Sequence, residues 1–150
     1  MCSGTTQEGS IVQVSAIMQR QLITAKPNMS LADVQRLMHD RHIRHVPVVS
    51  GKQLAGIITD RDIRDASPSP ATTLARGEIA YHMATTPIKN YMTQDVVCIH
   101  PDVDIVEATR LLLHRHFGCV PVMDQGILVG IITELDCLRA FLDSVGGSQD

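Results

Sequence analysis

Two copies of one short motif carry the residues best suited to bind a ligand. The first copy is Gly-Ile-Ile-Thr-Asp-Arg-Asp at residues 56–62, and the second is Gly-Ile-Ile-Thr-Glu-Leu-Asp at residues 130–136. In each copy the isoleucines favour a buried strand, and threonine followed three residues later by aspartate favours a capped helix start. Free N–H groups at a helix start attract phosphate, and a carboxylate can accept hydrogen bonds from ribose hydroxyls. The motif therefore indicates either helix capping alone or a nucleotide site.

The elements around this motif recur along the chain at a constant spacing. Asp136 follows Asp62 by 74 residues, and the same offset maps the Val-Pro-Val at 120–122 on the one at 46–48. Such a repeat without gaps indicates an internal duplication. Because one unit is too small to bury a core of its own, we expect the two copies to pack face to face with approximate twofold symmetry.

Apolar spacing and helix caps predict the order strand, helix, strand, strand, helix in each copy. In the first copy we expect a short strand at 22–24, a helix after Ser30, strands at 46–49 and 54–59, and a helix from Asp60. The second copy repeats this order, and we expect its last helix to run from Glu134 to Leu142. Thr72 or Thr73 is predicted to cap a linker helix from Leu74 to about Met83, and residues 1–10 are predicted to be disordered.

Composition excludes several classes of function. The net charge is −3 and no basic run occurs, which argues against nucleic acid or an anionic membrane as the main partner. The four cysteines form no Cys-x-x-Cys pair, and three of them lie inside apolar strand or helix patterns, so we expect them to be small buried hydrophobes. The compartment that we expect is reducing and cytoplasmic. No apolar leader or membrane-length stretch is present, and no local catalytic signature indicates an enzyme.

Histidines offer a second candidate constellation. His39, His42 and His45 lie close in sequence, as do His114 and His116, and such groups suggest either a metal cluster or a solvated surface. No cysteine or carboxylate obviously completes a ligand set, so we predict solvated histidines and no metal site. We do not extend this prediction of a solvated surface to His45, because it directly precedes the Val-Pro-Val strand.

These features together resemble a known family. Each copy, with its Val-Pro-Val strand and its Gly-Ile-Ile-Thr-x-x-Asp turn, resembles a CBS domain, and the pair resembles a tandem CBS protein, or Bateman module. The resemblance assigns residues 14–65 to a first CBS domain, 66–87 to a linker and 88–143 to a second CBS domain. The linker is also similar to that of small bacterial tandem CBS proteins of the acetoin-utilisation accessory type.

The resemblance implies an α+β fold of duplicated β-α-β-β-α units packed with pseudo-twofold symmetry. It also implies clefts for adenosyl ligands, which are AMP, ADP or ATP, with S-adenosylmethionine or NAD as further possibilities. It implies no required cofactor. It also implies a homodimer. Carried over by position, the motif aspartates bind ribose hydroxyls, the motif threonines lie beside ribose or phosphate, and the residues before Val-Pro-Val face the phosphates. The implied ligand-binding residues are Thr24, Arg44, His45, Val46, Pro47, Ile58, Thr59, Arg61 and Asp62 in the first copy, and Cys98, Cys119, Val120, Pro121, Ile132, Thr133 and Asp136 in the second.

The two copies differ in charge around the motif. The first has Arg44, His45, Arg61 and Arg64 where the second has Gly118, Cys119, Leu135 and Leu138. Since phosphate needs cationic or N–H donors, we predict that the site containing Asp62 is the better phosphate site. The sequence thus favours a regulatory module that binds an adenine nucleotide and acts on an unknown partner protein. The alternative is a structural homo-oligomeric module with vestigial clefts.

Overall fold

The computed structural model describes residues 12–69 and 71–146, so the predicted disorder of residues 1–10 lies outside the described residues. The first half contains α1 (Val14–Ile17), α2 (Leu31–Arg41), β1 (His45–Ser50), β2 (Gln53–Thr59) and α3 (Asp60–Ala66), and is followed by α4 (Arg76–Thr85). The second half contains the 3-10 helix η1 (Ile88–Asn90), α5 (Ile105–Arg115), β3 (Cys119–Asp124), β4 (Ile127–Thr133) and α6 (Glu134–Val145). The starts of corresponding elements differ by the 74 residues of the sequence repeat, and the α+β fold is confirmed.

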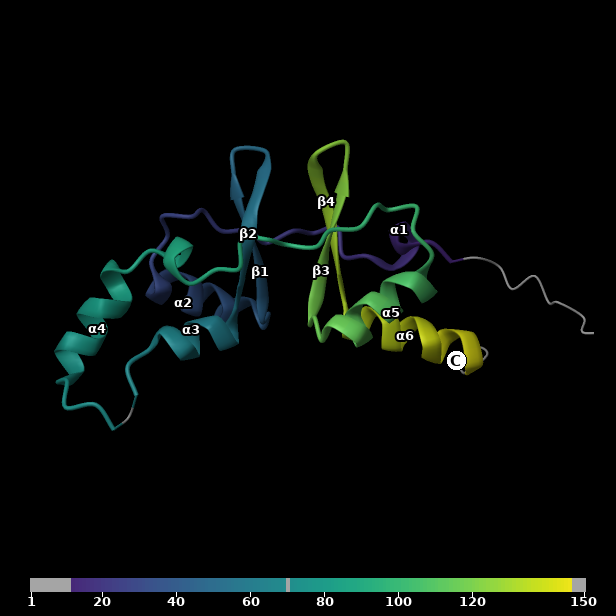
Figure 1. The fold of residues 1–150 in the computed structure, drawn as a ribbon. Helices are drawn as coiled ribbons and strands as arrows, with labels where there is room; N and C mark the ends of the chain where they lie inside the picture. Colours follow the sequence, from purple (N-terminus) through teal and green to yellow (C-terminus); the bar gives the residue numbers. More distant parts are fainter. Residues whose placement is uncertain (1–11, 70, 147–150) are drawn as a thin grey trace, which may run out of the picture.

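Each half is built on one antiparallel hairpin, β1–β2 or β3–β4. His45 lies opposite Thr59 in the first hairpin, and Cys119 lies opposite Thr133 in the second. The residue before each Val-Pro-Val is therefore placed beside the threonine that starts the next helix. The two hairpins stand side by side and the helices lie on the outer flanks (Figure 1).

The predicted first strand of each copy is wrong. Residues 22–24 and 97–99 form no strand, and only isolated parallel bridges occur, from Ala25 to Val48 and from Ile99 to Val122. A proline follows each bridge residue after one intervening position and cannot donate to a ladder, which ends the pairing at once.

The segment that leads into each half, residues 14–19 or 88–93, packs against the other half; we call these two stretches the lead-in segments. The N–H of Val14 donates to the carbonyl of Val103 at 2.8 Å, and the N–H of Ile88 donates to the carbonyl of Met29 at 2.8 Å. Val14 and Met18 are buried in the core of the second half, while Ile88 is buried in the core of the first. This exchange ties the halves together in addition to the contact between β2 and β4, where Ile57 and Ile131 are both buried.

The glycine of each Gly-Ile-Ile-Thr motif is where a lead-in segment crosses a hairpin. A Cβ atom on Gly56 would lie 2.5 Å from the carbonyl oxygen of Thr93. A Cβ atom on Gly130 would lie 2.6 Å from the sulfur of Met18 and 3.0 Å from the carbonyl oxygen of Gln19. The missing side chain at these two positions therefore allows the close approach of another segment of the chain.

The linker helix and the last helix differ from their predicted bounds. Helix α4 begins at Arg76 rather than Leu74, and the Glu78 carboxylate accepts the Ala75 N–H at 2.8 Å, so the predicted threonine cap is wrong. Helix α6 continues to Val145, three residues beyond Leu142. Within residues 12–69 and 71–146, no helix has the length and apolar character needed to cross a membrane.

Candidate ligand site between the repeats

The threonine and aspartate of each motif form the predicted capping box. The Thr59 hydroxyl accepts the Asp62 N–H at 3.1 Å, and the Asp62 carboxylate accepts the Thr59 N–H at 2.8 Å. The Thr133 hydroxyl and the Asp136 N–H are 3.4 Å apart, and the Asp136 carboxylate accepts the Thr133 N–H at 2.8 Å. Both aspartates are therefore fixed at the start of a helix, α3 or α6, directly after a buried strand.

The two aspartates differ in what else they contact. Asp136 is only 6% exposed, and its carboxylate also accepts the Gln19 side-chain N–H at 3.2 Å and the Thr133 hydroxyl at 3.0 Å. Asp62 is half-buried, and the hydrogen bond to its carboxylate in the structure comes from the Thr59 N–H. A carboxylate has about four acceptor positions, so Asp62 keeps more of them for a ligand than Asp136 does.

Sequence reasoning missed Gln19, because it belongs to a lead-in segment and lies 117 positions from Asp136. The repeat offset places Thr93 at the corresponding position of the other lead-in. A comparison of these two positions would have signalled a difference between the copies, since threonine is too short to span the same distance.

His45 contacts the opposite repeat. A Cβ atom placed on Gly118 would clash with its Nε2 atom, so the imidazole rests on the backbone of the second half. The charges that act on His45 come from both repeats, with Asp60 and Asp62 on α3 and Glu134 on α6. Burial lowers the pKa of His45 below its ordinary value of 6.5, and the carboxylates, led by Asp60, partly oppose this.

This pKa shift predicts how stability depends on pH. Because the pKa is lower in the folded protein than in the unfolded chain, the unfolded chain binds more protons as pH falls below about 6.5. His45 therefore contributes stability above that pH, and the contribution is lost on acidification. We expect the free energy of unfolding, measured in urea at pH 7.5 and 5.5, to fall less in His45→Gln than in the wild type. An equal fall in both proteins would contradict this, since the other histidines are common to both.

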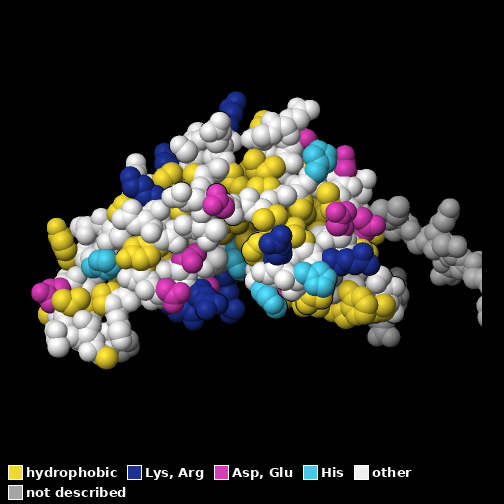
Figure 2. Space-filling model, viewed as in Figure 1, with side chains coloured by type: hydrophobic (Ala, Val, Ile, Leu, Met, Phe, Trp, Pro, Cys, Tyr) yellow, Lys and Arg dark blue, Asp and Glu magenta, His cyan; other side chains and the backbone are white. Residues whose placement is uncertain are grey.

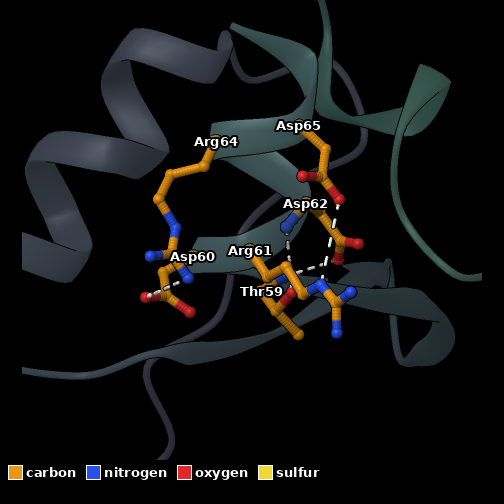
Figure 3. A network of polar contacts seen from close by, with 6 residues as sticks. All are labelled: Thr59, Asp60, Arg61, Asp62, Arg64 and Asp65. Atoms are coloured by element: carbon orange, nitrogen blue, oxygen red, sulfur yellow. Dashed lines mark hydrogen bonds and ion pairs between the residues drawn. The ribbon is translucent and has the colours of Figure 1, made fainter.

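The arginines beside Asp62 pair with carboxylates on their own helix. Arg61 lies 4.0 Å from Asp65, and Arg64 lies 3.6 Å from Asp60 (Figure 3). The two arginine side chains are 82% and 70% exposed, so each pair adds little stability and either side chain can turn to a ligand at small cost. Figure 2 shows Lys and Arg side chains gathered along the lower edge of the half that contains α3.

Comparison with known proteins identifies the repeat. The sequence model of the CBS domain matches residues 14–69 and 88–143. The chain belongs to the CBS domain family. An uncharacterized 33.4 kDa protein in the ribosomal RNA operon of Thermofilum pendens is 33% identical over 129 residues, which cover 85% of this chain and 43% of that relative. The chain thus spans less than half of that relative's length.

Solved CBS structures show the same fold. A putative acetoin utilization protein, AcuB, from Vibrio cholerae has a TM-score of 0.76 at 29% identity, over 91% of this chain and 95% of AcuB. The CBS domain pair of protein MJ0100 has a TM-score of 0.74 at 27% identity, over 90% of this chain and 99% of that pair. That pair was solved in complex with 5′-methylthioadenosine and S-adenosyl-L-methionine.

The remaining predicted site residues of this CBS pair divide by exposure. The Val-Pro residues of each hairpin and the isoleucines opposite them are buried, which leaves only their backbone groups for a ligand; they are Val46, Pro47, Ile58, Val120, Pro121 and Ile132. Thr24 and Cys98 are exposed, each directly before a bridge residue that pairs with a Val-Pro-Val strand. Arg44 is exposed, and its carbonyl accepts the N–H of Asp60 at 3.0 Å.

The cysteines of the CBS pair have different surroundings. Cys119 is buried with Ile57 and Ile131 where the repeats meet, and burial raises the pKa of its thiol to about 12. Cys137 is buried in the second core, whereas Cys98 is exposed outside any strand, so the predicted burial is wrong for Cys98. Cys2 lies outside the described residues.

The histidine clusters do not converge. His39, His42, His114 and His116 are exposed at the ends of α2 and α5. Among the residues that the structure describes, no three histidine, cysteine or carboxylate side chains gather closely enough to hold a metal ion.

Proposed function

We propose that this CBS pair is a regulatory module that binds an adenosyl ligand where its repeats meet, at the start of α3. The candidates are AMP, ADP or ATP, with S-adenosylmethionine or NAD as further possibilities. The single observation that carries the proposal is the Asp62 carboxylate. It is half-buried, held in place by the Thr59 N–H at 2.8 Å, and still able to accept further hydrogen bonds.

The groups around Asp62 suit a nucleotide. A 1,2-diol such as ribose donates two hydrogen bonds, and a fixed carboxylate can accept both. His45 and Arg44 precede β1's Val-Pro-Val and lie opposite or beside the threonine that starts α3, where they would face the phosphate. The related pair of MJ0100, which binds two adenosyl compounds, supports this ligand class.

The regulatory mechanism that we propose is a shift between two arrangements of the repeats. His45 belongs to the first repeat and rests on Gly118 of the second, so a ligand that contacts His45 acts on the contact between them. Such a ligand shifts the equilibrium only by its difference in affinity for the two arrangements. A partner protein, or the homodimer that the family implies, would respond to the arrangement.

One observation favours a second function, a structural homo-oligomeric module. Asp136 is 6% exposed and already accepts hydrogen bonds from Gln19 and Thr133, so the second site has little left to offer a ribose. If the first site were equally inactive, the exposed apolar side chains of α6 would be the chief functional surface.

A thermal-shift panel separates these functions. We expect AMP, ADP, ATP, S-adenosylmethionine or NAD to raise the melting temperature, because a ligand at 100 times its Kd stabilises a protein by about 2.7 kcal/mol. The control is 2′-deoxy-AMP, which retains the base and the phosphate but lacks one ribose hydroxyl and should stabilise less. No stabilisation by any adenosyl compound at millimolar concentration would favour the structural module. Mass spectrometry of small molecules that co-purify with the protein would then identify the ligand or show that none is retained.

A further inference from the structure

The last residue of each lead-in segment is fixed against a hairpin by its backbone. Gln19 and Ile131 exchange two backbone hydrogen bonds of 2.9 and 3.0 Å, and Thr93 and Ile57 exchange two of the same lengths. Each isoleucine lies two residues before the threonine that starts the next helix. The backbone therefore places residues 19 and 93 in the same way, and what differs between the two positions is the side chain.

The side chain of Gln19 reaches the aspartate of the second motif. Its Nε2 atom lies 3.2 Å from Oδ1 and 3.4 Å from Oδ2 of Asp136. An ionised carboxylate only accepts hydrogen bonds, so the amide nitrogen is the end of the glutamine that faces it. A ribose diol would donate its two hydroxyls to the same pair of oxygens. Gln19 thus takes the place that a ribose would need at Asp136.

The first motif lacks this contact. Within residues 12–69 and 71–146, the structure shows no side-chain hydrogen bond between Thr93 and Asp62, whose carboxylate accepts the Thr59 N–H. Threonine carries its hydroxyl on Cβ and does not reach as far as glutamine. The burial of the two aspartates agrees with this difference, because Asp136 is 6% exposed whereas Asp62 is half-buried.

The contact between Gln19 and Asp136 can be removed without moving the lead-in segment. Gln19 is an exposed residue, so hydrogen bonds rather than burial hold its side chain in place. Without it, the Asp136 carboxylate would keep the two hydrogen bonds from the N–H and hydroxyl of Thr133. A carboxylate has about four acceptor positions, which leaves about two for a ribose.

We propose that Gln19 closes the second of two adenosyl sites, so that the chain binds one adenosyl ligand rather than two. The first site stays open because Thr93 stands at the equivalent position. The residue at the end of each lead-in segment therefore sets how many ligands bind. This inference deepens the proposed function and rests on it, because it assumes that a motif aspartate binds ribose.

The test exchanges the two side chains. Gln19→Thr gives the second site the residue that the first site has, and Thr93→Gln makes the reverse change. The full-length proteins are titrated with AMP and with adenosine, and the backbone amide signals of Asp62 and Asp136 in proton–nitrogen NMR spectra report the two sites separately. Adenosine has no phosphate, so the smaller number of cationic residues around the second motif does not weaken its binding.

We expect the wild type to bind both compounds at Asp62 alone. A hydrogen bond to a charged group is worth about 10- to 100-fold in a binding equilibrium, so Gln19→Thr should tighten adenosine binding at Asp136 by that factor. Thr93→Gln should weaken binding at Asp62 by a similar factor. The binding gained in Gln19→Thr should be lost again in Gln19→Thr/Asp136→Asn, which a merely structural effect of the threonine would not predict.

The matched control is Arg20→Thr, which introduces threonine one residue further along the chain. The Arg20 side chain is exposed and donates to the Ser15 carbonyl at 2.8 Å, so we expect this variant to bind as the wild type does. A second site in Arg20→Thr would overturn the inference, because any change in the segment would then open it. If Gln19→Thr does not fold, Thr93→Gln decides, and unchanged binding at Asp62 overturns the inference.

The remaining outcomes separate this inference from the proposed function. A wild type that binds at both aspartates, or a Gln19→Thr variant that still binds only at Asp62, would overturn the inference and leave the proposed function standing. A wild type that binds at neither aspartate, with a Gln19→Thr variant that binds at Asp136, would support the inference and refute the site at Asp62. No binding of either compound by any of these proteins would overturn both.

Discussion

Asp62→Asn is expected to weaken AMP binding about 10- to 100-fold, whereas Asp136→Asn should change it by about twofold or less. The 10- to 100-fold loss of affinity expected for Asp62→Asn corresponds to the loss of charge-assisted hydrogen bonds to ribose. The small change in affinity expected for Asp136→Asn follows because the Asp136 carboxylate is 6% exposed and already accepts hydrogen bonds from Gln19 and Thr133. The two variants make the same chemical change at equivalent positions of the repeat, so each serves as the control for the other.

Asparagine is the informative substitution because it keeps an oxygen that can accept the threonine N–H. That hydrogen bond is 2.8 Å long in both repeats, and its loss would disturb the helix start as well as the site. Isothermal titration calorimetry with AMP measures both affinities, and a melting curve for each variant checks that the fold is intact. Equal losses of affinity in the two variants would contradict the predicted difference between the sites. No loss of affinity in either variant would mean that neither aspartate binds the ligand.

The second large effect is expected at Gly56, where Gly56→Ala should lower the free energy of unfolding by about 1–3 kcal/mol. A methyl group there would lie 2.5 Å from the carbonyl oxygen of Thr93, which is backbone and cannot rotate away. Relief would require the lead-in segment to move and would weaken the two hydrogen bonds that join Ile57 and Thr93, of 2.9 and 3.0 Å. The exchange of segments between the halves would loosen with it.

Two further glycines provide the controls. Gly130→Ala should cost less than Gly56→Ala, because the closest atom, at 2.6 Å, is the flexible Met18 sulfur and the backbone oxygen of Gln19 is 3.0 Å away. Gly77→Ala in α4 meets no atom within 4 Å and should raise stability by about 0.5 kcal/mol. Urea unfolding curves of the three variants check the order, and a Gly56→Ala protein as stable as the wild type would show that the crossing is not tightly packed.

The sequence predicted best where the determining interactions are local. Threonine and aspartate three residues apart can close a capping box without help from the rest of the chain, and both boxes are present. The two hairpins likewise follow from β-branched residues around a short turn, with Gly51 and Gly126 in the left-handed region at φ values of 63° and 77°. Prediction was poorer at residues 22–24 and 97–99, where apolar residues suggested strands but a nearby proline limits pairing to one bridge.

The sequence by itself determined the duplication, the strand-to-helix turns with their aspartates, and the charge difference between the repeats, because each depends only on residue types at fixed spacing. Only the tertiary structure decided which half each lead-in segment joins, that Gln19 hydrogen-bonds to Asp136, and that α4 packs against the core of the first half. The physical reason is that the two halves have nearly the same apolar pattern. A lead-in or linker segment can bury its side chains against either half, and the chain path and the space left by glycines select between them.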